Sequence, residues 1–457
     1  MALDITDDSK IDNLDSLVSY FQGGCKAEDD WRIGTEHEKF PFYKDDFRPV
    51  PYEGARGIRT ILEGMQSALG WKPILDEGNI IGLVESSGQG AISLEPGGQF
   101  ELSGAQLKTI GHTYCEVMEH LAILKKISEP LGIGFLGIGA SPKWTLAETP
   151  RMPKSRYQIM ADYMPKVGHN GLNMMYRTST VQVNLDFSSE TDMRRKMQVS
   201  MKLQSIVTAL FASSPFTEGR PNGFLSWRSE IWRDTDNQRT GVLPFIFSEH
   251  FGFADYVEWA LDVPMYFVVR DGRYHDCTHI TFRQFMNGAL RGQVTNATPN
   301  MGDWINHLST LFPEVRLKRF LEMRGADCGS WKRICALSAF WVGLLYDSEA
   351  LNEAEALTKD WCFKEVLDMR EHVPKEGLRT PFRQTIILEL ARQVIAISRK
   401  GLKNRRQYDA DGCDETNFLT PLEEVVAIGQ TDADKFLSRY YSIWGETVEP
   451  IFSECAY

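Results

Sequence analysis

Two glutamates stand two residues apart in the segment Ile33–Phe40. In a β-strand, side chains two residues apart point to the same face and lie about 7 Å apart. Glu36 and Glu38 would therefore share one face, while His37 and Lys39 would take the other. Two carboxylates at this distance can share a divalent cation or hold two. Charged side chains also occupy the exposed faces of ordinary strands, so this segment alone leaves both interpretations open.

Acidic residues recur in two further segments that alternate polar and apolar side chains. In Ser93–Ser103, Glu101 lies on a polar face and Glu95 directly precedes a Pro-Gly-Gly turn. In Arg316–Arg324, Glu322 shares one face with basic side chains, which can bind metal and phosphate together with it or pair with it as surface ions. Oxygen ligands of this kind suit Mg²⁺ or Mn²⁺. We therefore predict a divalent-metal site and phosphate chemistry, with these candidate ligands: Glu36, Glu38, Glu95, Glu101 and Glu322.

Two more segments supply candidate substrate contacts. Thr178–Phe187 alternates an apolar face with a wholly polar face that includes Gln182 and Asn184, although such a face can also simply meet water. The segment 221–241 combines turn-forming residues, two tryptophans and the arginines Arg228, Arg233 and Arg239. Guanidinium groups suit bidentate binding of carboxylate or phosphate, but an ordinary surface loop has the same composition.

The elements that must position these residues are predicted from hydrophobic periodicity. Alternation with period two predicts the strands Trp31–Phe42, Ala91–Ser103, Tyr176–Phe187, Pro264–Asp271 and Arg316–Arg324. Helical periodicity predicts the helices Ala105–Ser128, Asp192–Phe211, Trp331–Tyr346 and Pro381–Leu402, and two shorter helices after Leu419. Parallel strands buried on both faces are usually continuous apolar runs, whereas several of these strands have one polar face. We therefore predict an α+β fold with an antiparallel sheet whose polar face lines a cavity.

Composition and charge narrow the class of protein. The chain has 457 residues, of which 42% are hydrophobic and 25% are charged, the balance of a folded globular protein. Its net charge of −12 argues against general binding to nucleic acid or to anionic membranes. The longest run of small and apolar residues, Leu131–Ala140, is too short to cross a bilayer and is predicted to be a buried strand. No repeat or linker divides the sequence, so we predict one large domain over 1–457, with its core from about residue 31 and C-terminal helices from about residue 330.

The start of the chain and its cysteines predict a cytoplasmic location. The first residues include acidic side chains where a secretory signal would be basic. The eight cysteines contain no CxxC pair, which argues against a zinc ribbon or a thioredoxin motif. Reduced thiols are the default in the cytoplasm.

Several of these segments together resemble glutamate–cysteine ligases of the plant and proteobacterial type: Gly34–Phe40, Leu94–Gly104, Phe135–Gly139 with Pro142–Trp144, Arg228–Trp232 and Leu321–Asp327. The resemblance runs from about Trp31 to the C-terminus. It implies a glutamine-synthetase-like catalytic core, in which a curved, mainly antiparallel sheet forms a funnel with helices outside.

The resemblance also implies roles for individual residues. It matches four acids with the metal ligands of the family, namely Glu36, Glu38, Glu101 and Glu322, and it matches Glu95 more loosely because a turn follows it. It implies that the active-site floor and its surroundings bind substrate through Gln182, Asn184, Arg228 and Arg239. It implies that Arg233 and Arg324 are catalytic residues that contact the substrate carboxylate or the phosphoryl group.

The implied reaction joins the γ-carboxylate of L-glutamate to the amine of L-cysteine while ATP becomes ADP and phosphate, the first step of glutathione biosynthesis. A carboxylate is a poor acyl donor, so its oxygen must first attack the γ-phosphoryl group to form an acyl phosphate. Because the substrates supply both nucleophiles, catalysis depends on positioning and on neutralisation of oxygen charge.

Two alternatives to this reaction stay open: a related carboxylate–amine ligase with another amine acceptor, and an inactive sensor or binding protein with the same fold. The expected small-molecule partners are L-glutamate, L-cysteine and ATP, with Mg²⁺ as the cofactor. The expected assembly is a monomer or a homodimer, without nucleic acid or membrane.

Cys115 and Cys335 match positions at which plant members of the family carry a redox-active disulfide. Oxidation would then tie the helix Ala105–Ser128 to the helix Trp331–Tyr346 and change activity. The second cysteine pair of the plant members is matched only at Cys277. The alternative is that both thiols are buried and reduced core residues, as free cysteines commonly are.

Overall fold

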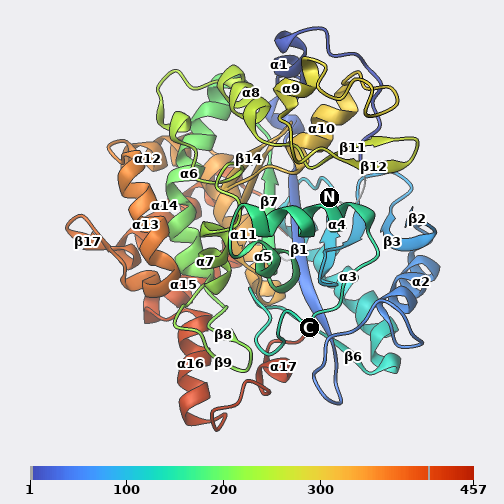
Figure 1. Ribbon diagram of the computed structural model, residues 1–457. Coiled ribbons are helices and arrows are strands. Elements are labelled where there is room, and N and C mark those ends of the chain that lie inside the picture. Colours follow the sequence, from blue (N-terminus) through green and yellow to red (C-terminus); the bar gives the residue numbers. More distant parts are fainter. Residues whose placement is uncertain (1–3, 410–411) are drawn as a thin grey trace.

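The computed structural model describes residues 4–409 and 412–457, and a nine-stranded sheet runs through its centre (Figure 1). The strands follow the order β14-β15-β7-β1-β5-β4-β3-β2, β6 pairs with the second half of β1, and every pairing is antiparallel. The strands are β1 (Ile33–Tyr43), β2 (Lys72–Asp76), β3 (Asn79–Val84), β4 (Ala91–Leu94), β5 (Phe100–Ser103), β6 (Ile133–Leu136), β7 (Thr180–Leu185), β14 (Val315–Leu317) and β15 (Leu321–Asp327). The predicted α+β fold with a mainly antiparallel sheet is thus confirmed.

Alternate side chains of strand β1 point to two faces of the sheet that differ chemically. The side chains of Thr35 and His37 point to the helical side, where Thr35 shares a hydrogen bond of 2.9 Å with Ser338 and the His37 ring lies 5.6 Å from that of His120. Alternation along a strand then sends Glu36 to the opposite face, together with the glutamate two residues further on. One face of the sheet is therefore packed against helices, and the other face carries the two glutamates.

Helices cover the packed face of the sheet. Helix α3 (Ile110–Ser128) and helix α11 (Trp331–Leu345) contact β1, and α6 (Glu190–Phe211) contacts β15. Outside α11 lie the C-terminal helices α12 (Ser348–Thr358), α13 (Phe363–Glu376), α14 (Ile387–Arg405) and α15 (Thr420–Ile428), which gather on one side in Figure 1. Helix α11 is buried almost all round, which is why its sequence is apolar on every side.

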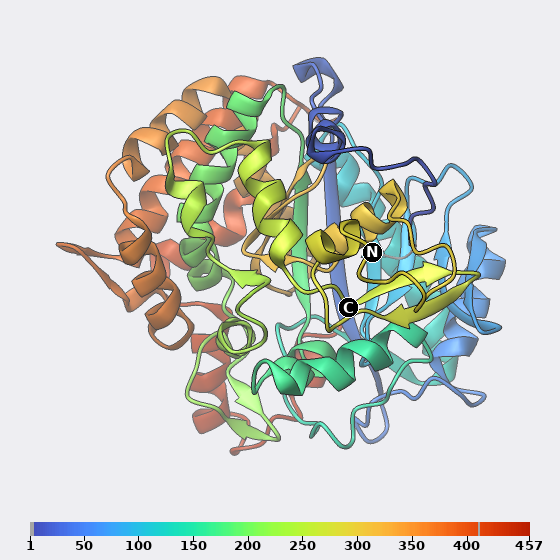
Figure 2. The ribbon, with the colours of Figure 1, turned by 45° about the horizontal axis from the view of Figure 1, so that its top comes forward.

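Shorter elements surround the other face. The hairpin of β11 (Phe267–Arg270) and β12 (Arg273–Asp276) and the helix α10 (Met301–Ser309) lie in front of the sheet in Figure 2. The other ribbons pair β8 (Phe216–Thr217) with β9 (Arg220–Pro221), β10 (Thr240–Gly241) with β13 (Phe312–Pro313), and β16 (Pro381–Phe382) with β17 (Thr385–Ile386). The remaining helices are α1 (Leu14–Gln22), α2 (Ile58–Leu69), α4 (Ser155–Tyr163), α5 (Gly171–Arg177), α7 (Trp227–Arg233), α8 (Phe253–Asp262), α9 (Phe282–Met286), α16 (Asp432–Ser442) and α17 (Ile451–Glu454).

Three predicted elements need correction. The segment 91–103 is not one strand, because the Pro-Gly-Gly turn reverses the chain between β4 and β5, with Gly98 at a φ of +85°. The segment 316–324 is likewise a hairpin of β14 and β15, which places Arg316 directly opposite Glu322. The helix predicted from Pro381 begins only at Ile387, because the preceding residues form the hairpin of β16 and β17.

Within residues 4–409 and 412–457, no single helix is long and apolar enough to span a membrane. The helices α11 and α12 are long and apolar enough only when taken together, and they are bent by 88° relative to each other.

Candidate active site

A cavity lies over the face of the sheet that carries the glutamates. Its floor comes from β1, β5 and β7, and its walls come from α4, α10 and the segments around β11, β13, β14 and β15. The lining residues are Glu36, Glu38, Glu95, Glu101, Arg156, Tyr157, Met160, Gln182, Phe267, Ser309, Thr310, Phe312, Arg316 and Arg324. Four of the five predicted acids thus lie in one cavity.

The strand registers bring these residues together. Glu38 lies opposite Glu101 in the pairing of β1 with β5, and Glu36 lies opposite Gln182 in the pairing of β1 with β7. Directly opposed residues of antiparallel strands point to the same face, with Cβ atoms about 5 Å apart. Segments that are remote in the sequence therefore supply one continuous polar floor.

Each glutamate on the floor accepts hydrogen bonds from its neighbours. Asn184 donates to Glu36 over 2.8 Å, and the backbone N–H of Thr180 donates to Glu38 over 3.0 Å. Glu101 accepts from the hydroxyls of Ser93 and Ser103, at 2.6 and 3.0 Å, and the Tyr157 hydroxyl lies 3.4 Å from Glu95. These bonds fix the orientation of the carboxylates and leave other lone pairs for a ligand.

The crowding of carboxylates makes the cavity floor attractive to cations. Burial raises the pKa of Glu38 well above its ordinary value, the nearby Glu95 and Glu101 raise it further, and Arg228 opposes this only in part. Burial also raises the pKa of Glu36 and Glu95, and neighbouring carboxylates add to the effect. A bound cation would relieve this repulsion.

The donor chemistry of the floor fits Mg²⁺, since it consists of hard carboxylate oxygens. As the side chains lie, however, no three His, Cys, Asp or Glu side chains in the described residues converge closely enough to hold a metal ion. The metal prediction therefore rests on the kind of donors and on their mutual repulsion.

Glu322 differs from the other predicted metal ligands. Its side chain is 0% exposed, and Arg316 contacts both of its oxygens, at 2.6 and 2.9 Å. Lys318 lies 2.8 Å away, and Arg324 also donates to it. Burial alone would raise the pKa of Glu322, but the three cations together hold it well below its ordinary value. The structure does not place Glu322 in the cavity lining, because these cations surround it.

Two of the predicted arginines belong to the site. Arg324 lines the cavity and donates to the side chain of Gln182, which links the wall to the floor. Arg228, at the start of α7, is buried and donates over 3.0 Å to the backbone carbonyl of Arg324. Arg324 can therefore contact a ligand directly, whereas Arg228 supports the backbone beside it.

The other two predicted arginines lie elsewhere. Arg233 does not line the cavity: its side chain is 28% exposed and pairs with Glu230 and Glu371 at 2.7 and 3.4 Å. Arg239 is fully buried, pairs with Asp236 at 2.6 Å and lies 3.9 Å from the centre of the Tyr266 ring. It stabilises the packing behind the site. The structure thus separates these two residues from the roles predicted for them.

Sequence reasoning missed Arg156. This residue lies on helix α4 and lines the cavity together with Tyr157 of the same helix and with Glu95. Arg156 pairs over 3.1 Å with Asp4, whose side chain also accepts a hydrogen bond from Tyr274. The guanidinium of Arg156 is therefore already paired with a carboxylate. The spacing of Arg156 gave no signal, because α4 lies outside the alternating strands. Arg316 was noticed on its strand but received no role.

The structure describes both cysteines of the predicted switch as free thiols. Cys115 is exposed on α3, whereas Cys335 is fully buried on α11. Burial raises the pKa of Cys335 to about 12, and the nearby Cys115 adds to the effect. The alternative of two buried core thiols therefore holds for Cys335 and not for Cys115, and the disulfide stays a prediction.

The fold is α+β with a mainly antiparallel sheet, and acids and arginines meet around one cavity on that sheet, as expected for the ligases that the sequence segments resemble. Residues 32–454 match the model of glutamate-cysteine ligase family 2, and the chain belongs to this family. It is 53% identical over 443 residues to the chloroplastic glutamate–cysteine ligase A of Oryza sativa subsp. indica, covering 97% of this chain and 88% of the relative. The chloroplastic glutamate–cysteine ligase of Arabidopsis thaliana is also 53% identical, with 97% and 83% covered.

A solved structure supports the fold. The crystal structure of glutamate–cysteine ligase from Francisella tularensis in complex with AMP superposes with a TM-score of 0.55, covering 98% of this chain and 89% of that chain. Its sequence identity is 11%, so the likeness concerns the fold alone.

The comparisons also correct one prediction. The relatives from rice, tobacco and Arabidopsis are named as chloroplastic proteins, so the predicted cytoplasmic location is wrong. The acidic residues among the first residues of the sequence therefore do not indicate the compartment.

Proposed function

We propose that the protein joins the γ-carboxylate of L-glutamate to the amine of L-cysteine and converts ATP to ADP and phosphate. Its relatives from rice and Arabidopsis are named glutamate–cysteine ligases. The observation that carries the proposal is the cavity on the sheet, where residues from the family-matching segments at Glu36, Glu101 and Arg324 meet. The cavity draws on residues from 36 to 324, which supports one catalytic domain.

The residues of the cavity are suited to the two chemical steps. First, an oxygen of the glutamate γ-carboxylate attacks the γ-phosphorus of ATP, ADP leaves, and an acyl phosphate forms. Second, the cysteine amine attacks the acyl carbon, phosphate leaves with that carboxylate oxygen, and the amine gives up a proton. Arg324 can hold anionic oxygens of the substrates by charge-assisted hydrogen bonds, and Arg156 can do so only where a substrate replaces Asp4 as its partner. Gln182 orients Arg324 over the floor.

The floor glutamates are the proposed holders of the divalent cation. Glu38, Glu95 and Glu101 repel one another in the cavity, and Glu36 completes the acidic floor. Mg²⁺ bound there would neutralise charge on the phosphoryl oxygens. Glu322 has a different proposed role: it pairs with Arg316, Lys318 and Arg324. It thereby positions Arg316 and Arg324, the two of these cations that line the cavity.

The proposal is tested by ADP release from ATP with glutamate and a panel of amine acceptors. The proposed activity predicts ADP formation that requires Mg²⁺ and glutamate and is fastest with L-cysteine. Faster turnover with another amine would identify a related carboxylate–amine ligase instead. No glutamate-dependent ADP with any acceptor, from a folded protein, would favour an inactive binding protein.

A further inference from the structure

Strand β15 contains one extra residue where it supplies Arg324 to the active site. In its pairing with β7, the two residues Arg324 and Gly325 lie opposite the single residue Gln182. This two-against-one arrangement is a β-bulge, which bends a strand and re-aims a side chain. Met323 and Ala326, on either side of the bulge, are both buried in the main core, although residues three apart in a regular strand point to opposite faces. The bulge therefore decides which side chains of β15 face the cavity.

The bulged residues need hydrogen-bond partners outside the pairing of β15 with β7. A bulge leaves its extra residue without a place in the ladder, and buried backbone N–H and C=O groups need partners. The N–H of Arg324 donates to the backbone carbonyl of Glu314 over 3.2 Å, and its carbonyl accepts from the guanidinium of Arg228 over 3.0 Å. The two backbone groups of Gly325 take their partners from helix α6, which packs against β15.

Gln204 and Thr208 of α6 bind these two groups. The N–H of Gly325 donates to Oε1 of Gln204 over 2.9 Å, and its carbonyl accepts from the hydroxyl of Thr208 over 2.9 Å. Both side chains are buried, and a spacing of four residues places them on the same face of the helix. A Cβ atom at position 325 would lie only 2.3 Å from Oε1 of Gln204, so this close approach requires a glycine.

The helix thus holds the backbone of an active-site residue from the opposite side of the sheet. The side chain of Arg324 lines the cavity and donates to Gln182 and to Glu322. Gln204 and Thr208 do not line the cavity, so they reach the substrates only through the backbone of β15. A misplacement of about 1 Å, caused by a change far from the reacting atoms, can lower a rate by about 100-fold.

We propose that Gln204 and Thr208 are positioning residues for the ligase reaction, because they hold the bulge in the conformation that aims Arg324 at the substrates. The inference rests on the proposed function, in which Arg324 contacts anionic oxygens of the substrates. It extends the set of residues that serve the reaction to the helical side of the sheet.

The first test is a double-mutant cycle between Gln204 and Arg324. Gln204→Met has a side chain of similar length and removes the acceptor for the N–H of Gly325. It should lower kcat/KM for glutamate-dependent ADP release at least fivefold in the wild-type background and less than twofold in the Arg324→Ala background. The same fold-loss in both backgrounds would show that Gln204 acts independently of Arg324 and would overturn the proposal, as would an unchanged kcat/KM in the single variant.

The second test compares two substitutions of Thr208. Thr208→Val keeps the shape of the side chain and removes the hydroxyl, whereas Thr208→Ser keeps the hydroxyl. The kcat/KM of Thr208→Val should be at least threefold lower than that of Thr208→Ser. Equal values would contradict a positioning role for the hydrogen bond to the carbonyl of Gly325.

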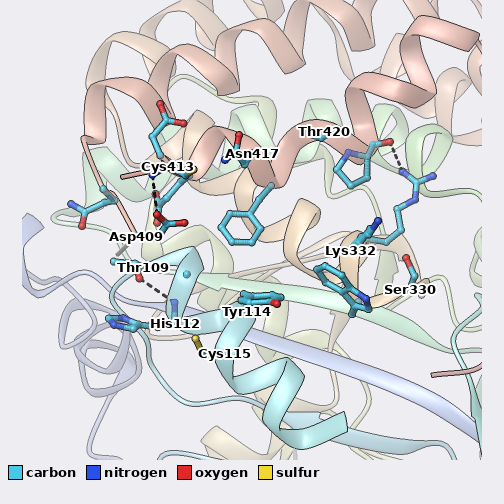
Figure 3. A pocket seen from close by; sticks show the side chains of 18 of the residues that line it. Thr109, His112, Tyr114, Cys115, Ser330, Lys332, Asp409, Cys413, Asn417 and Thr420 are labelled. Atoms are coloured by element: carbon cyan, nitrogen blue, oxygen red, sulfur yellow. Dashed lines mark hydrogen bonds between the residues drawn. The ribbon is translucent and has the colours of Figure 1, made fainter. Parts of the chain in front are cut away.

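Two control variants measure the effect of general destabilisation. Ser200→Ala removes a buried hydroxyl of α6 that has no hydrogen-bond partner within the described part of the chain. Thr109→Ala removes a side-chain oxygen that accepts a hydrogen bond of 3.1 Å from the backbone N–H of His112, in the first turn of α3 (Figure 3). Both variants should change kcat/KM less than twofold. A loss in Thr109→Ala as large as that in Gln204→Met would assign the effect to stability and contradict the proposal.

A crystal structure of Gln204→Met separates this inference from the proposed function, because it requires no turnover. We expect the side chain of Arg324 to have left Gln182, while the pairing of β1 with β7 keeps its register. An Arg324 side chain in its wild-type position would overturn the proposal even in an active enzyme. A displaced Arg324 in a protein that releases no ADP would support the positioning role and refute the proposed function alone.

Discussion

The replacement of Glu322 by glutamine tests whether this residue anchors cations or binds metal. Glu322 lies within 3 Å of nitrogen atoms of both Arg316 and Lys318, and it also accepts from Arg324, while none of its surface is exposed. Removing one partner of a buried ion pair typically costs about 3–5 kcal/mol, because the remaining charge stays buried without a counterion. We therefore expect Glu322→Gln to lower the free energy of unfolding by about 3–5 kcal/mol.

Glu38→Gln provides the matched control, because it makes the same chemical change on the same sheet. Glu38 is repelled by Glu95 and Glu101, and a glutamine can still accept the hydrogen bond from the backbone N–H of Thr180. Its free energy of unfolding should therefore stay within about 1 kcal/mol of the wild type or increase, since the repulsion from the two carboxylates is relieved and the buried Arg228 keeps its larger interaction, with Asp327. Its Mg²⁺-dependent ADP release should fall at least 100-fold.

The assay is guanidinium unfolding followed by tryptophan fluorescence and circular dichroism, together with ADP release for each variant. Unfolding of a chain of this size can be irreversible, so unfolding rates should be compared alongside midpoints. If Glu322→Gln is as stable as the wild type and its loss of activity is relieved by higher Mg²⁺, Glu322 is a metal ligand. In that case the reasoning from its three cations is refuted.

Three further predictions concern other residues. Arg324→Ala should lower kcat/KM at least tenfold, as expected for the loss of a charge-assisted contact of about 1.5–3 kcal/mol. Arg233→Ala should change kcat/KM less than twofold, because it breaks only partly exposed ion pairs. Equal effects of the two substitutions would show that Arg233 contributes to the active site. Burial raises the pKa of Glu116 to about 7, so the folded state holds the proton of Glu116 more tightly than the unfolded state, and stability falls as pH rises from about 4.5 to about 7. Glu116→Gln should therefore be more stable than the wild type at pH 8 and equal to it at pH 4. Parallel curves of stability against pH for the two proteins would contradict this. Oxidation should change activity in the wild type and not in Cys335→Ser if the two thiols pair, and identical activity of the oxidised and reduced wild type would remove the switch.

Most of what could be predicted about the site followed from the alternation of polar and apolar side chains along the strands. It correctly separated Glu36 and Glu38 from His37, because a strand has a period of two whatever its partners are. It failed to predict where strands reverse, since a short turn can keep the alternation going, and this hid the pairing of Arg316 with Glu322.

The arginines show a second limit of sequence reasoning. The composition of the segment 221–241 allows either an anion-binding segment or an ordinary surface loop, but it does not reveal that Arg228 and Arg233 lie at the two ends of helix α7. At 3.6 residues per turn, five residues rotate a side chain by about 140° around a helix, so the two arginines cannot face the same cavity. Arg156 lies on α4, and only tertiary contacts of that helix, such as the hydrogen bond from the Tyr157 hydroxyl to the backbone carbonyl of Leu94, bring it to the acids.

The central claim is that the γ-carboxylate of glutamate is activated by phosphoryl transfer in the cavity on the sheet. The most direct measurement is the fate of ¹⁸O in L-glutamate labelled at both γ-carboxylate oxygens, during turnover with ATP, Mg²⁺ and L-cysteine. The account predicts that each phosphate released carries one ¹⁸O, that γ-glutamylcysteine forms in equal amount, and that Glu38→Gln abolishes both. Phosphate without label, with the γ-carboxylate retaining both ¹⁸O atoms, would contradict it.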